Sequence, residues 1–129
     1  MIRYLDNLRF VFAIDSFTCV SAGLLMLLGA NWLAPLLGLP ASLLVWAGGA
    51  LLPVAVLFGF MSLHAPTNRT LLLLAVAGNM LWVIGSVIVA CVFSPTLLGF
   101  TFVVMQAGVV AVLALLEASG LRSPASAKA

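Results

Sequence analysis

Two long stretches without charged side chains dominate this sequence. No Asp, Glu, Lys or Arg lies between Asp15 and Arg69, or between Arg69 and Glu117. The whole chain of 129 residues carries only five basic and three acidic side chains, whereas roughly a quarter of the residues of a soluble domain are charged. This pattern excludes a globular cytosolic enzyme, a disordered chain and a nucleic-acid-binding protein. It predicts an integral membrane protein.

The number of membrane crossings follows from segment lengths. A bilayer core of about 30 Å takes about 20 helical residues at about 1.5 Å each. The sequence predicts four such helices, at about 9–29, 43–63, 70–93 and 97–116. We therefore expect an all-α polytopic membrane protein, a single domain at 1–122 that forms an antiparallel bundle of four transmembrane helices, followed by a disordered cytoplasmic tail at 123–129.

The basic residues predict the orientation of this bundle. All five fall outside the predicted spans or at their ends, and all on the same side of the membrane: Arg3, Arg9, Arg69, Arg122 and Lys128. The connections on the other side carry none. Because positively charged loops stay in the cytoplasm, both termini are expected to be cytoplasmic.

The connection at 30–41 is unusually apolar for an aqueous loop. We expect it to lie along the outer membrane interface, with Trp32 and Trp46 near the depth of the lipid headgroups. A lid over a buried pocket is the alternative interpretation of the same segment.

A few polar side chains fall within the predicted spans, and they are the candidates for ligand binding or proton coupling. Asp15 lies about 9 Å into a helix that begins near Arg9, where a charged carboxylate facing lipid would be expensive, so we expect it to face the bundle. The full candidate set, grouped by helix, is Asp15 and Thr18, then Asn79, Trp82 and Ser86, then Gln106. Their alternative role is structural, because interhelical hydrogen bonds hold membrane helices together.

Two further side chains, Glu117 and His64, are expected to lie at the surface and to have no role inside the bundle. Glu117 lies near the cytoplasmic end of the last helix with Arg122 close in sequence, which predicts a pair at the surface. The only histidine is His64, and the sequence has no metal-binding, nucleotide-binding or hydrolase motif. The sequence therefore predicts no metal, no cofactor and no enzymatic activity.

Three stretches of the chain resemble a group of small uncharacterised bacterial four-helix inner-membrane proteins. They are the apolar string at 33–40, the Asn79-x-x-Trp82 pair, and the segment at 95–107. The resemblance covers most of the chain. It implies a bacterial inner membrane and a four-helix bundle, and it carries no activity.

Chain length and the acid in the first helix are also similar to small multidrug resistance transporters. In that family a carboxylate in the first helix couples protons to cationic drugs, and Asp15 is the matching position. The residue is Asp instead of the family's Glu, and the tryptophan and glycine motifs of the later helices are not recognisable.

Two functions remain open on the sequence. The first is a non-enzymatic module that packs with itself or with a larger membrane partner and holds a lipid-like or hydrophobic ligand inside the bundle. The second is a small proton-coupled transporter of hydrophobic or cationic solutes, in which Asp15 titrates and Asn79 and Gln106 line the path. We favour the first, because four short helices leave little room for transport machinery. Neither function involves nucleic acid.

Overall fold

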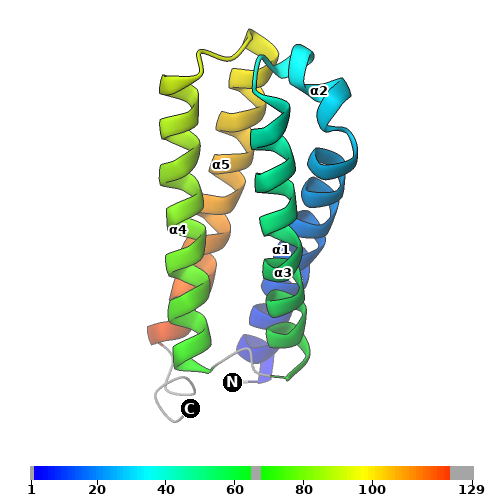
Figure 1. Cartoon of the computed structure of the whole chain (residues 1–129). Helices are drawn as coiled ribbons and strands as arrows, with labels where there is room; N and C mark the ends of the chain where they lie inside the picture. Colours follow the sequence, from blue (N-terminus) through cyan, green and yellow to red (C-terminus); the bar gives the residue numbers. More distant parts are fainter. Residues whose placement is uncertain (1, 65–67, 123–129) are drawn as a thin grey trace.

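A computed structural model describes residues 2–64 and 68–122, with side chains at 7–64 and 68–121. Within those residues every regular element of secondary structure is a helix. In chain order the elements are α1 (Ile2–Leu28), α2 (Ala30–Leu37), α3 (Ala41–His64), α4 (Arg69–Val92), α5 (Leu97–Ala118) and the 3-10 turn η1 (Ser119–Arg122). The first residues of α1 and the last residues of η1 lie at the same end of the molecule (Figure 1).

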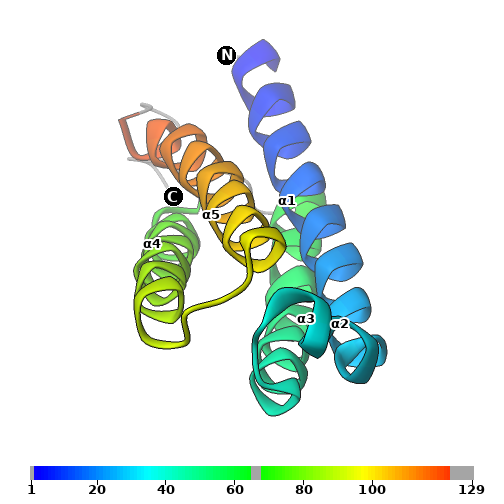
Figure 2. The ribbon, with the colours of Figure 1, turned by 90° about the horizontal axis from the view of Figure 1, so that it is seen from above.

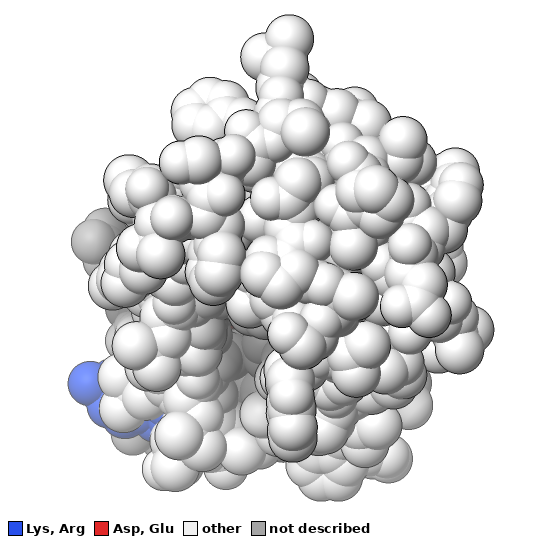
Figure 3. Space-filling model, turned by 45° about the horizontal axis from the view of Figure 1, so that its top comes forward, with Lys and Arg blue, Asp and Glu red and all other residues white. Residues whose placement is uncertain are grey.

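Four of these helices are long and apolar enough to cross a membrane. The candidate spans are Asn7–Leu28, Ala41–His64, Arg69–Val92 and Leu97–Leu121. Their outward faces are apolar, and the surface seen in Figure 3 is almost free of charge, with basic atoms only near one edge. The fold is therefore compatible with a small multi-pass integral membrane protein, as the charge-free stretches predicted.

The first helix begins earlier than predicted. It starts at Ile2 instead of about residue 9, so Asp15 lies about 20 Å from its first residue at 1.5 Å per residue. Hydropathy marks where a helix enters lipid and not where it begins, which is why the polar turns at 2–8 were missed. The predicted disordered tail at 123–129 lies outside the described residues.

The apolar connection at 30–41 contains a helix, α2, instead of a loop. The helix ends at Gly38, which has a φ of 68° in the left-handed region that glycine favours, and its N–H bonds to the Ala34 carbonyl. Leu33 and Leu37 on α2 are buried. At the same end of the bundle, Thr96 donates its hydroxyl to the Leu36 carbonyl over 2.7 Å. Its N–H bonds to the Leu37 carbonyl over 3.1 Å. The α2 helix thus follows α1 in the chain and is hydrogen-bonded to Thr96, the residue directly before α5.

The long helices are arranged as two pairs, α1 with α3 and α4 with α5 (Figures 1 and 2). The first pair is in backbone contact at two glycines. A Cβ added to Gly48 would lie 2.7 Å from the Gly23 carbonyl oxygen and 2.8 Å from the Leu27 nitrogen. Two serine hydroxyls also join these helices: Ser16 donates to the Ala55 carbonyl over 2.7 Å, and Ser62 donates to the Arg9 carbonyl over 2.8 Å.

The two pairs meet mainly through α1 and α5, with α2 packed between them at one end. The other two helices of the pairs, α3 and α4, make little direct contact with each other. Figure 2 shows the separation between these two helices from above. The cavities and the bond between Asn79 and Asp15 lie between the two pairs.

Candidate functional site

Three polar side chains from three helices meet inside the bundle and form what we call the carboxyl cluster: Asp15 of α1, Asn79 of α4 and Glu117 of α5. The Asn79 amide donates both of its bonds here, to Asp15 Oδ2 over 3.1 Å and to Glu117 Oε1 over 2.7 Å. The exposed fractions are 1% for Asp15, 6% for Asn79 and 0% for Glu117. The cluster is therefore shielded from lipid, as an ionisable group within a span must be.

The remaining oxygens of the two carboxyls differ in their partners. Asp15 Oδ1 accepts a weak bond from the Cys19 thiol at 3.7 Å. Glu117 Oε2 is buried and has no hydrogen-bond partner, although the Asp15 and Glu117 carboxyls both accept from the same Asn79 nitrogen and therefore lie close together. Among the described side chains, no cation is paired with either carboxyl, and Arg9 and Arg69 are exposed.

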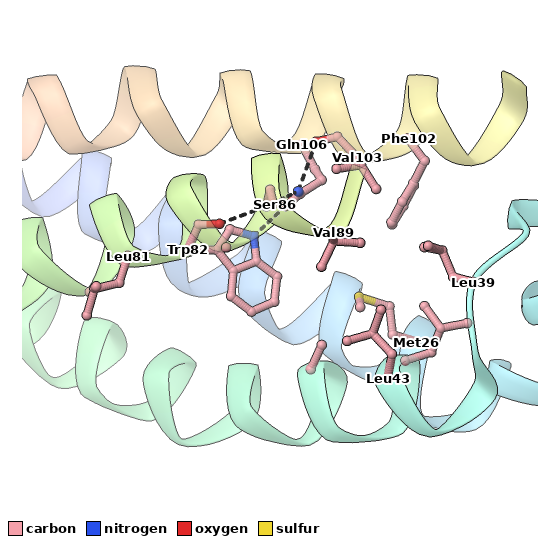
Figure 4. A pocket seen from close by; sticks show the side chains of 14 residues that line it. Met26, Leu39, Leu43, Leu81, Trp82, Ser86, Val89, Phe102, Val103 and Gln106 are labelled. Atoms are coloured by element: carbon pink, nitrogen blue, oxygen red, sulfur yellow. Dashed lines mark hydrogen bonds between the residues drawn. The ribbon is translucent and has the colours of Figure 1, made fainter. Parts of the chain in front are cut away.

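A second group of polar side chains, the tryptophan cluster, lies on α4 and α5 further along the bundle (Figure 4). The Trp82 indole N–H donates to Gln106 Oε1 over 2.5 Å. Gln106 Nε2 donates to Ser86 Oγ over 2.9 Å and to the Val103 carbonyl over 3.0 Å. Ser86 in turn donates its hydroxyl to the Trp82 carbonyl over 2.7 Å. This network holds the indole ring in one orientation between the helix pairs.

Two cavities adjoin the Trp82–Gln106 bond. The carboxyl cavity has a volume of about 360 Å³ and is lined by Asp15, Thr18 and Asn79 together with apolar side chains of α3. The apolar cavity has a volume of about 350 Å³, and Figure 4 shows the side chains around it, including Met26, Leu39, Leu43, Val89, Phe102 and Val103. Gly78, Trp82 and Gln106 line both.

Both cavities are bounded by α3 and α4, the two long helices that make little contact. On α4, Gly78 and Gly85 present no side chain to this gap, and a Cβ added at either would meet nothing within 4 Å. The molecular surface is hollowed on this side (Figure 3). The gap between α3 and α4 thus adjoins both cavities.

The structure brings most of the predicted site residues into these two clusters. Asp15 and Asn79, from different helices, bond to each other directly. Trp82, Ser86 and Gln106 form the second cluster. Thr18 lines the carboxyl cavity, but its hydroxyl bonds to the Asp15 backbone carbonyl of its own helix over 2.9 Å. The roles of these six residues in binding or proton coupling stay predictions.

The interpretation of Glu117 as part of a surface pair is wrong. Its side chain is fully buried and bonds to Asn79, while the Arg122 side chain lies outside the described residues. One sequence signal did point inward: Glu117 follows Gln106 by eleven residues, close to three helical turns, so both lie on one face of the helix. This helical spacing was a better indication of where Glu117 lies than its closeness to Arg122 in the sequence.

Comparison with known proteins adds no template for this geometry. No family model, no curated protein and no solved structure matches the chain. The resemblances inferred from the sequence therefore stay predictions.

Proposed function

We propose that this chain is a small, non-enzymatic integral membrane protein that binds a lipid-like or hydrophobic ligand between its two helix pairs. The observation that carries this proposal is the pair of cavities that share Gly78, Trp82 and Gln106 and adjoin the gap between α3 and α4. The exposed apolar faces of the helices contact the bilayer, and they also offer surfaces for a second copy or a larger membrane partner.

The size and lining of the cavities support a ligand. Protein interiors are close-packed and have few voids larger than a water molecule, whereas ligand pockets have volumes of roughly 300–1,000 Å³ and mostly apolar walls with a few polar groups. Both cavities fall within this range and have this composition. Because they adjoin lipid, hydrocarbon is the expected occupant.

The proposal includes the placement of the protein in the membrane. We propose an antiparallel bundle in a bacterial inner membrane, with both termini in the cytoplasm. Arg9 and Arg69 support this orientation, because they lie towards the end of the bundle where α1 begins and η1 ends. The α2 helix and the connection between α4 and α5 contain no basic residue.

Native mass spectrometry of the protein released from lipid nanodiscs tests ligand binding. Wild-type protein is expected to retain a specific lipid or hydrophobic molecule. Gly78→Leu is expected to reduce this retention at least tenfold, because the new side chain enters space that both cavities share.

The matched control is Gly108→Leu on α5. Gly108 also has nothing within 4 Å of an added Cβ, but it lines neither cavity. This variant should retain the ligand as the wild type does. Wild-type protein that carries no specific adduct, or Gly78→Leu protein that keeps it undiminished, would contradict the proposal.

A small proton-coupled transporter of hydrophobic or cationic solutes is the second candidate. The observation that favours it is the buried Asp15 carboxyl in the wall of a cavity. Addition of tetraphenylphosphonium to purified protein, with a pH-sensitive dye present, would then release protons from the wild type but not from Asp15→Asn. If the wild type releases no protons, the transporter function is contradicted and ligand binding without proton coupling remains.

A further inference from the structure

We infer that Asp15 and Glu117 form one proton-binding site, in which a single proton is shared between the two carboxyls and Asn79 orients both. The proton forms an O–H bond with Glu117 Oε2 and is hydrogen-bonded to the Asp15 carboxylate. The ligand of this site is the proton itself, and the inference holds whichever molecule occupies the cavities.

The first argument is the number of hydrogen-bond donors. A neutral amide has two N–H hydrogens, and Asn79 donates one to each carboxyl. Among the described side chains no donor remains for Glu117 Oε2, which is buried without a partner. Buried polar atoms are almost always hydrogen-bonded. A proton on Oε2 turns this acceptor into a donor, and the nearest acceptor group given by the shared bonds to Asn79 is the Asp15 carboxyl.

The second argument is electrostatic. Two ionised carboxylates joined through one amide would repel each other strongly in a low-dielectric interior. Around them, α1 contributes the Cys19 thiol and α4 the Asn79 amide, and on α5 the residues one turn before Glu117, Leu113 and Ala114, are apolar and buried. The α3 side chains that line the carboxyl cavity are all apolar.

Cations elsewhere in the described chain do not neutralise the pair. Arg9, His64 and Arg69 are exposed. Arg69 donates to the Leu121 carbonyl, and the His64 ring packs against Phe60. One proton removes the repulsion and leaves a single carboxylate that accepts from Asn79, from Cys19 and from the Glu117 hydroxyl. With no cation near the pair among the described side chains, a single added proton is the smallest change that gives Glu117 Oε2 a partner.

Only the Asp15 side of the proton-binding site faces a cavity. Asp15 and Asn79 line the carboxyl cavity, whereas Glu117 lies behind them and lines neither cavity. A molecule in the cavity therefore meets the Asp15 side of the shared proton first.

Infrared spectroscopy of the protein in lipid nanodiscs tests this inference, because protonated carboxylic acids have a C=O stretching band that carboxylates lack. The chain has only three acidic side chains, so the spectrum is simple to assign. At neutral pH the wild type is expected to show one such band, which shifts in deuterated water. Asp15→Asn and Glu117→Gln should each shift or abolish the band, because each removes one half of the shared hydrogen bond.

Asp6→Asn serves as the matched control, since it removes the third acid and should leave the band unchanged. Two results would overturn the inference. One is a wild-type spectrum without a protonated-acid band at neutral pH, a measurement that needs no variant to fold. The other is a band that stays unshifted in both Asp15→Asn and Glu117→Gln, which would place the proton elsewhere.

Discussion

Asn79 is the residue on which the carboxyl cluster depends. It is the only described side chain that donates to both Asp15 and Glu117. Replacing it with Leu leaves two buried acceptors without their donor, which should lower the free energy of unfolding by about 1–3 kcal/mol. Reversible unfolding in mixed micelles measures this change.

The control for that prediction is Asn31→Leu on α2. Asn31 is exposed, and surface substitutions usually change stability by less than about 0.5 kcal/mol. An Asn79→Leu protein as stable as the control would mean that the two bonds to the carboxyls contribute nothing to the fold.

Single residues also show what a sequence can and cannot predict about the site. Asp15 and Asn79 could be selected because a polar group within a span is costly and must face the interior. That they bond to each other depends on how α1 and α4 are placed in space, and no local pattern contains that information. The position of Glu117 at a helix end suggests solvent, whereas its side chain is fully buried and bonds to Asn79 of α4.

At the scale of elements, the contact between α1 and α3 is set by glycine. A side chain at Gly48 would collide with backbone atoms of Gly23 and Leu27. Gly48→Ala should therefore push the helices apart and destabilise the protein by about 1–3 kcal/mol. Thermal or detergent-induced unfolding measures the loss.

The neighbouring residue provides the matched control. A Cβ added at Gly49 meets nothing within 4 Å, so Gly49→Ala should be neutral or stabilise the helix by up to about 1 kcal/mol. Equal effects of the two substitutions would show that α1 and α3 do not approach each other as closely as described.

The elements differ in how far they could be predicted. The long apolar helices follow from chemistry, since a charge-free stretch in lipid must satisfy its own backbone bonds. The α2 helix could not be predicted from the sequence, because eight residues that include Pro35 have weak helical preference of their own. It is stabilised by burial of Leu33 and Leu37 and by the bonds from Thr96, and these are tertiary contacts.

At the scale of the whole molecule, the proposed orientation predicts which residues are accessible from each side of the membrane. In a Cys91→Ser background, with Cys19 buried, a membrane-impermeant maleimide should label Asn31→Cys in intact cells. Thr70→Cys should be labelled only after the cells are permeabilised. Both positions are exposed in the structure. Labelling of Thr70→Cys in intact cells would contradict the proposed orientation and indicate the reverse one.

Occupation of the space between the helix pairs by hydrocarbon is measured most directly by tryptophan fluorescence. Trp82 lines both cavities, whereas Trp32 and Trp46 are 67% and 79% exposed on the outside. A Trp32→Phe/Trp46→Phe protein thus reports from Trp82 alone. In bilayers of lipids brominated along the acyl chain, its emission should be strongly quenched, and Gly78→Leu should relieve the quenching while Gly108→Leu does not. Emission that is unquenched, or quenched equally in all three proteins, would contradict the account.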